Sequence, residues 1–167
     1  MEESKNPPDL FTLSPIGVIH SPYTDPTGMP IQPNGARGIR GTVEIFPEYA
    51  GGLSDLDGFS RVILIYIFHR SGSYNLKVTP FLDTTARGVF ATRAPKRPNP
   101  IGLSVVRLIE VQDRTLIIED VDILDGTPLL DIKPYVPEFD AYPDASCGWL
   151  ETTAHGAGSF RANGRFR

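Results

Sequence analysis

The chain has 167 residues, 40% of them hydrophobic, and a formal net charge of −4. This length fits one domain with an ordinary core, and the small net charge does not imply a surface that binds polyanions as a whole. The only cysteine, Cys147, cannot form an intrachain disulfide, and the scattered histidines give no zinc-type spacing, so no metal is expected.

Both ends of the chain are expected to be flexible. Residues 1–12 form a lead without the basic and apolar regions of a secretory signal. The longest apolar run, Val62–Phe68, is too short to span a bilayer, so no membrane segment is expected. The single cysteine fits a reducing compartment, and we expect a cytoplasmic protein. Residues 151–167 are glycine-rich and basic, which predicts a flexible tail or an arm that touches nucleic acid. The folded domain is expected over residues 13–150.

Strand signals fill most of this domain. Runs rich in β-branched and aromatic residues are separated by Gly, Pro and Asp, and Arg61–His69 reads as a strand buried on both faces. Only Pro47–Leu56 predicts a short helix, and Gln112–Arg114 predicts a hairpin connection. Many short strands with few helices predict an all-β fold, a small closed barrel. The expected strands are Leu13–His20, Gly41–Phe46, Arg61–His69, Leu76–Leu82, Gly88–Thr92, Ile101–Val111, Thr115–Glu119 and Val121–Leu124.

The segment Gly88–Arg107 combines basic and proline residues. Residues 84–109 hold five basic side chains and no acidic one, and three prolines between residues 95 and 100 make a stiff, non-helical loop. A rigid cationic loop suits an anionic or nucleotide-like ligand, although a solvated connection between strands has the same composition. Residues 119–144 carry eight acidic groups and one base, so the charge is segregated along the chain.

Three further segments carry polar groups beside strands. Gly28–Pro33 places Gln32 between prolines, and His69-Arg70 ends the most apolar strand. Asp125–Pro128, with the sequence Asp-Gly-Thr-Pro, predicts a tight turn whose carboxylate and hydroxyl can hold a polar ligand. Each segment taken alone is as compatible with an ordinary loop or turn.

Taken together and in this order, these segments resemble one family. FSRVILIYIFHR (59–70), GVFATRAPKRPNPIGLSVV (88–106) and DILDGTPLLDIKPYVPEFD (122–140) are similar to the TsaA-like, or TrmO, family of methyltransferases. IGVIHSPY (16–23) and PDAS (143–146) match the same pattern, so the resemblance covers about residues 13–150.

The resemblance implies a small β-barrel, unlike the Rossmann-like fold of most methyltransferases, and a homodimer with S-adenosylmethionine near the subunit interface. The methyl group would go to the exocyclic N6 of a threonylcarbamoyl-modified adenosine beside the tRNA anticodon. Ile31 stands where some members carry a basic residue. Carried over by position, the cofactor contacts fall on Pro30, Ile31, Gln32, His69, Arg70, Arg93, Leu103, Asp125, Gly126, Thr127 and Pro128.

The chemistry of these residues agrees with that ligand. Arg93 or Arg70 can bind the cofactor's carboxylate, and the Asp125 turn can bind its amino group. Lys96, Arg97 and Asn99 are the candidates for contacts with phosphates and bases of the anticodon loop, which is single-stranded and open to stacking. No catalytic base is assigned.

Two other functions fit the same residues. One is a methyltransferase of this architecture with another small or nucleotide acceptor, and the other is a non-catalytic module that binds S-adenosylmethionine or RNA. The presence of His69, Arg93 and the Asp-Gly-Thr-Pro turn together favours an enzyme.

Overall fold

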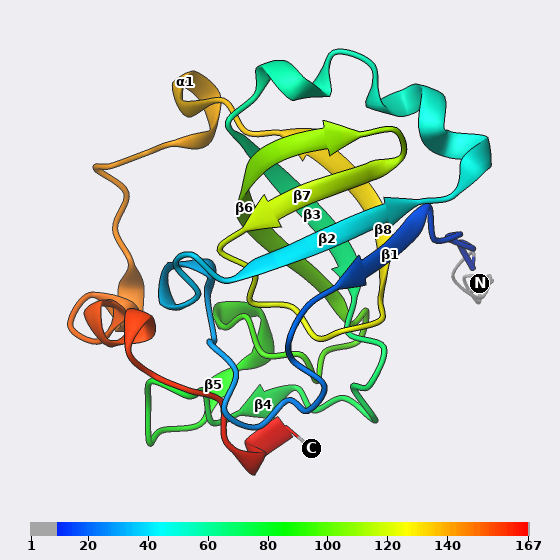
Figure 1. Ribbon diagram of the computed structural model, residues 1–167. Helices are drawn as coiled ribbons and strands as arrows, with labels where there is room; N and C mark the ends of the chain where they lie inside the picture. Colours follow the sequence, from blue (N-terminus) through cyan, green and yellow to red (C-terminus); the bar gives the residue numbers. More distant parts are fainter. Residues whose placement is uncertain (1–9, 167) are drawn as a thin grey trace, which may run out of the picture.

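The computed structural model describes residues 10–166, so most of the predicted N-terminal lead lies outside the described residues. Six antiparallel strands form a closed barrel in the order β1-β2-β7-β6-β3-β8, and β8 pairs with β1 to close it (Figure 1). The predicted all-β barrel is confirmed. Its strands are β1 (Gly17–His20), β2 (Arg40–Ile45), β3 (Arg61–Ile67), β6 (Ile101–Gln112), β7 (Thr115–Glu119) and β8 (Thr127–Pro134).

Side chains of the barrel strands alternate between the interior and the outside. In β3, Val62, Leu64 and Tyr66 are buried, while the residues between them are half-buried. The prediction that this strand is buried on both faces is therefore wrong, because a barrel strand has only one face inside. The barrel is filled by aliphatic side chains from every strand, each contributing about 1.5–3 kcal/mol when fully buried. The interior is thus a packed core and not a channel.

The segment between β3 and β6 departs from the predicted strands. Leu76–Leu82 contributes only β4 (Lys77–Val78), and Gly88–Thr92 contributes the end of β5 (Arg87–Gly88) before the chain turns into a 3-10 helix. These two short strands pair with each other outside the barrel. Pro80 follows β4 closely, and a proline cannot donate to a strand ladder, so an extended strand is not supported there.

The other correction concerns the segment between β7 and β8. Val121–Leu124 is not a strand, because Asp120 adopts a left-handed conformation, with φ of 67°, and ends the β7 ladder. Val121 and Ile123 are nevertheless fully buried, so their apolar character reflects core packing and not strand pairing. The strand β8, which begins within the Asp-Gly-Thr-Pro turn, is not among the strands expected from the sequence.

The helices are all short. The predicted helix Pro47–Leu56 is replaced by 3-10 helices over Pro47–Leu53 and Leu56–Gly58, and the one α-helix in residues 10–166, α1, spans Pro137–Asp140. None of the helices described is both long and apolar enough to cross a membrane. The other 3-10 helices are Pro33–Gly35, Val89–Ala91, Gly148–Leu150, Ala154–Gly158 and Gly164–Phe166.

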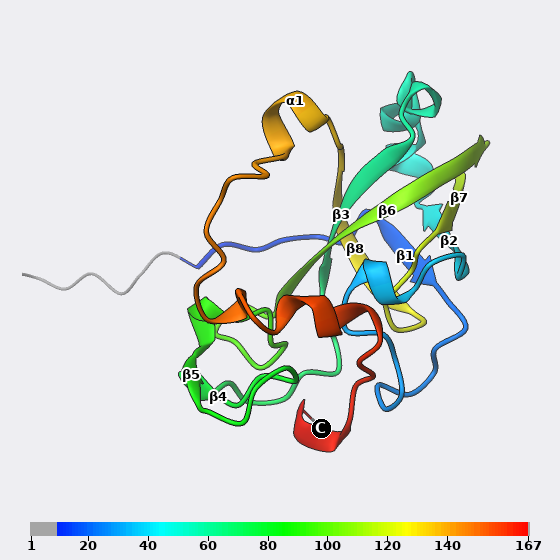
Figure 2. The same ribbon diagram turned by 90° about the vertical axis from the view of Figure 1, so that its left-hand side faces the viewer.

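The two ends of the barrel are covered differently. The 3-10 helices of residues 47–58 and α1 lie at one end, and a layer of loops from residues 21–39, 68–100 and 148–166 lies at the other (Figures 1 and 2). After α1 the chain runs down the side of the barrel as an exposed stretch, residues 141–148, to reach this loop layer (Figure 2).

The C-terminal segment packs into the loop layer. Arg161 forms an isolated β-bridge with Pro30, and its Nη2 donates to the Gly35 carbonyl at 3.2 Å. The Phe81 ring contacts those of Phe160 and Phe166, with centroids 5.9 and 4.9 Å apart. The sequence predicts a flexible tail here, and its mobility stays a prediction, but its side chains have defined partners in the body of the protein.

Candidate functional site at one end of the barrel

The strand register brings the predicted site segments to the loop-covered end of the barrel. β3 ends where β6 begins, with Ile67 opposite Ile101, and β1 ends where β8 begins, with Ile19 opposite Thr127. His69-Arg70 therefore follows β3 at the same end at which Asp125–Pro128 leads into β8. The Gly28–Pro33 loop and the proline-rich loop belong to the layer that covers this end.

The Asp125–Pro128 turn is fixed by its own hydrogen bonds. Gly126 adopts a φ of 75°, which favours glycine, and its N–H donates to the Ile19 carbonyl at 2.9 Å. The buried Thr127 hydroxyl donates to the Leu124 carbonyl at 2.6 Å. The predicted tight turn is therefore present.

His69 lies next to this turn. Its Nδ1 is 3.4 Å from the Thr127 hydroxyl oxygen. Because this hydroxyl donates its proton to the Leu124 carbonyl, it can only accept from His69, so Nδ1 carries the hydrogen in this contact. Burial, followed by the nearby Arg70 charge, lowers the pKa of His69. A neutral ring in this tautomer presents Nε2 as an acceptor. Arg70 itself donates to the Thr24 carbonyl at 2.9 Å.

Arg93 and Gln32 join the two loops of the covering layer. The Arg93 Nη1 donates to the Gln32 Oε1 at 2.9 Å. Of the other residues in this stretch, Pro30 is buried and Ile31 is half-buried. Sequence order alone could not show that residues 61 positions apart share a hydrogen bond.

Leu103 lies on the outside of the barrel. It is 51% exposed and is followed in β6 by Ser104, which points inward. Ile101, two residues earlier on the same outer face, is 40% exposed. The start of β6 thus presents an apolar surface beside the polar groups of the site.

A polar chain that the sequence analysis missed reaches from the barrel interior to this end. The buried Tyr66 hydroxyl lies 3.0 Å from the Ser104 Oγ, and Ser104 donates to the Asp122 Oδ1 at 2.6 Å. Burial raises the pKa of Asp122 to about 6, against the opposing effects of the Ser104 hydrogen bond and the Arg93 charge. Asp122 is the first residue of the DILDGTP motif, and this position in the motif is the sequence feature that could have identified it as a site residue.

The three candidate RNA-contacting residues have different surroundings. The Arg97 Nη1 donates to the carbonyls of Thr92 and Ala94 at 3.1 and 3.4 Å, so this guanidinium holds the loop together. Asn99 is exposed. Lys96 lines an open cavity of about 270 Å³ together with Asn75, Lys77, Val78, Thr79, Arg165 and Phe166.

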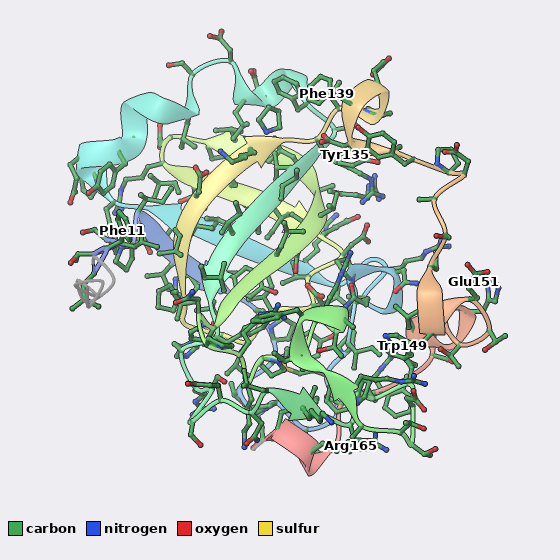
Figure 3. The ribbon with its side chains drawn as sticks, turned by 180° about the vertical axis from the view of Figure 1, so that it is seen from behind. Phe11, Tyr135, Phe139, Trp149, Glu151 and Arg165 are labelled. Carbon is green, nitrogen blue, oxygen red and sulfur yellow. The ribbon has the colours of Figure 1, made fainter. Side chains whose placement is uncertain are left out.

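Asp131 and Tyr135 follow the Asp125–Pro128 turn in sequence and have side chains that could act as a base, but their contacts lie elsewhere. Tyr135 lies outside this site. Its N–H donates to the Arg61 carbonyl at the start of β3, and the residue lies near α1 and far from Arg165 in the loop layer (Figure 3). Asp131, on β8, forms an ion pair with Lys133 at 2.9 Å. Within residues 10–166, no group of three or more His, Cys, Asp or Glu side chains is arranged to hold a metal ion.

A second open cavity, of about 410 Å³, lies on the barrel wall. Neither of these two cavities is lined by a residue of the predicted cofactor set. The second cavity is lined by His20, Ser21, Pro22, Arg40, Gly41, Thr42 and Ile117.

The fold and the site define a small, closed antiparallel barrel with a cluster of ligand-type polar groups at one end. Residues 18–141 match the family described as the tRNA-methyltransferase O N-terminal domain. The chain belongs to this family. The predicted family is thereby confirmed.

Individual relatives support the same assignment. A probable S-adenosyl-L-methionine-binding protein of Pyrococcus abyssi is 55% identical over 95% of this chain and 86% of its own length. A tRNA (adenine(37)-N6)-methyltransferase of Escherichia coli is 38% identical over 85% of this chain and 65% of its own length. The crystal structure of TrmO from Pseudomonas aeruginosa is 41% identical, with a TM-score of 0.72 over 84% of this chain and 63% of that one. The chain therefore spans a little under two thirds of the two relatives named for their methyltransferase function.

Proposed function

We propose that the chain is an S-adenosylmethionine-dependent methyltransferase that acts on an adenine base of tRNA. The observation that carries this proposal is that two contacts, Arg93 with Gln32 and His69 with Thr127 of the Asp125–Pro128 turn, lie at the same loop-covered end of a barrel of this family. The names of the relatives give the cofactor class and the acceptor class. A tRNA substrate is compatible with the net charge of −4, because the cations are concentrated in the loop layer.

The residues at this end suit the parts of S-adenosylmethionine. Arg93 offers a guanidinium for the carboxylate, and its hydrogen bond to Gln32 limits its motion. Gly126 is exposed, with nothing within 4 Å of the position a Cβ would occupy, so a ligand can approach its backbone. The Nε2 of neutral His69 accepts a hydrogen bond from an amino or hydroxyl group. Leu103 adds apolar contact beside them.

The cofactor supplies an already activated methyl group. The residues of the chain then have to bind it, align it with the acceptor nitrogen and exclude water. Alignment alone accounts for roughly 7–11 kcal/mol in the best oriented systems. A carbamoyl substituent makes the adenine N6–H more acidic, which favours its loss to a base, and we assign no residue to that role.

The finer parts of the proposal concern acceptor and assembly. We propose the threonylcarbamoyl-modified adenosine beside the anticodon as the acceptor, contacted by Lys96 and Asn99, in a cytoplasmic enzyme. We further propose a two-fold homodimer whose interface includes the exposed apolar residues Ile101 and Leu103, because isologous pairs are the commonest soluble oligomers. A partner subunit there would enclose the open site.

The experiment that tests the proposal is mass analysis of modified nucleosides in tRNA from cells with and without this gene. The expected result is loss of one methyl group from a threonylcarbamoyl-adenosine nucleoside, restored by the wild-type gene and not by the Arg93→Ala variant. An unchanged nucleoside profile would remove this acceptor and leave a methyltransferase with another small or nucleotide acceptor.

A further inference from the structure

Asp125 was the expected carboxylate partner for the amino group of the cofactor, but its carboxylate is already engaged. The Asp125 Oδ1 accepts the Ser21 N–H at 3.1 Å and lies 3.4 Å from the His20 Nδ1. These contacts tie the turn to the end of β1. The Asp125 carboxylate is therefore engaged by residues that directly follow and end β1.

Asp122 is the other carboxylate at this end of the barrel. It lies in the β7–β8 segment, is half-buried, and is oriented by the short hydrogen bond from Ser104, which is itself in contact with the buried Tyr66 hydroxyl. Shielding a charged carboxylate from water costs free energy unless a nearby cation compensates its charge. In residues 10–166, neither Asp122 nor Arg93 takes part in an ion pair, which would require nitrogen and oxygen within 4.0 Å.

Arg93 is nevertheless close enough for its charge to act on Asp122 and on Tyr66. A cation and an anion thus lie near each other at the site without an ion pair, and each is held by a neutral side chain, Arg93 by Gln32 and Asp122 by Ser104. This arrangement suits a ligand that carries both a negative and a positive group. The head group of S-adenosylmethionine is such a zwitterion, with a carboxylate and an ammonium on one carbon.

We propose that Asp122 binds the ammonium group of the cofactor's amino-acid head while Arg93 binds its carboxylate. Ser104 and Tyr66 are positioning residues, which hold the Asp122 carboxylate in place. The inference rests on the proposed function, because it requires a ligand with an α-amino-acid group.

The surroundings of Asp122 make this contact dependent on pH. The groups that face it are Arg93 from the proline-rich loop, Tyr66 from β3, Ser104 from β6 and Tyr23 from the β1–β2 loop, whose pKa is raised by burial and by the Asp122 charge. Of these four groups, only Asp122 has its pKa brought to about 6. Cofactor affinity should therefore fall as the pH drops below about 6. His69, whose pKa lies below its ordinary value, accepts a hydrogen bond only when it is neutral, so the Asp122→Asn variant should keep a weaker pH dependence than the wild type.

The test compares three ligands by calorimetric titration: S-adenosylmethionine, S-adenosylhomocysteine and methylthioadenosine. The first two carry the amino-acid head, the second lacks the sulfonium charge, and the third lacks both. Asp122→Asn keeps the shape of the side chain and can still accept from Ser104. It should weaken the first two ligands by about 10–100-fold, the usual scale for a lost charge-assisted hydrogen bond, and leave methylthioadenosine nearly unchanged.

Two further variants sharpen the comparison. Asp144→Asn removes an exposed carboxylate from the stretch after α1 and should change none of the three affinities. Asp125→Asn should weaken all three ligands to a similar extent, if at all, because it acts through the turn. Selective loss of the two amino-acid ligands in Asp125→Asn, but not in Asp122→Asn, would overturn the assignment.

Other results would overturn it as well. Equal weakening of all three ligands in Asp122→Asn would indicate a structural role, and weakening of S-adenosylmethionine alone would indicate a contact with the sulfonium. Wild-type protein that binds none of the three would overturn the proposed function itself, and this inference with it.

Discussion

Gly102 is the position at which a single added carbon should disturb both the barrel and the site. It lies opposite Tyr66 in the β3–β6 ladder, and a Cβ there would sit 2.5 Å from Cζ and 2.8 Å from Cδ2 of the Tyr66 ring. The ring cannot swing away easily, because Tyr66 is only 4% exposed and its hydroxyl contacts Ser104 at 3.0 Å. Phe68 packs edge-on against it, with centroids 5.5 Å apart.

The cost of Gly102→Ala can be worked from these contacts. Overpacking a well-filled core costs typically about 1–3 kcal/mol, and losing the Tyr66–Ser104 hydrogen bond adds about 1 kcal/mol. A total of about 2–4 kcal/mol lowers the melting temperature of a domain of this size by roughly 5–15 °C. Because Ser104 also holds Asp122, cofactor affinity should fall in the protein that remains folded.

The assay is thermal and urea unfolding of Gly102→Ala beside Gly52→Ala. Gly52 is a matched control, because nothing lies within 4 Å of the position of its added Cβ and its φ is outside the left-handed range. The control should unfold within about 1 kcal/mol of the wild type. A Gly102→Ala protein as stable as the control would refute the reasoning, since it would mean that the Tyr66 ring moves freely.

Three other predictions follow from the site. Arg93→Ala should weaken S-adenosylmethionine binding by about 1.5–3 kcal/mol, measured by calorimetry, and an unchanged affinity would exclude Arg93 from the site. Lys96→Ala should weaken tRNA binding and reduce the slope of log affinity against log salt concentration by about one, while cofactor affinity stays constant; an unchanged slope would remove this contact. Asp122→Asn should stabilise the fold above pH 6. Folding raises the pKa of this carboxyl from 3.8 to about 6, so the charged form costs stability at high pH, by about 1–3 kcal/mol. Urea unfolding at pH 4 and pH 8 should show this advantage only at pH 8, and an equal difference at both would contradict it.

The barrel was largely readable from the sequence, because strand patterns depend on local alternation. β2, β6, β7 and the hairpin between the last two were predicted close to their observed bounds. β8 was not, because the polar and proline-rich character of Asp-Gly-Thr-Pro hid the strand that starts inside it. Val121–Leu124 was wrongly predicted to be a strand, because most of its residues are apolar. Val121 and Ile123 pack in the barrel core without pairing with another strand.

The site was only partly readable. The motif order pointed to the family and to Arg93, His69 and the Asp125 turn, but spacing along a chain carries no distances between loops. The hydrogen bond between Arg93 and Gln32, the engagement of Asp125 by Ser21 and the orientation of Asp122 by Ser104 all depend on the barrel register. The structural use of Arg97 was also hidden, since a cation that binds backbone carbonyls looks in sequence like one that binds phosphate.

The most direct test of the central claim is methyl transfer in vitro. Purified protein is incubated with S-adenosylmethionine labelled in its methyl group and with tRNA that carries or lacks the threonylcarbamoyl group, beside the Arg93→Ala variant as a control. The account predicts label in the modified tRNA only, located on the adenosine next to the anticodon, and little label with the variant. No transfer to either tRNA, by protein that binds S-adenosylmethionine, would contradict the claim that this chain is a tRNA methyltransferase.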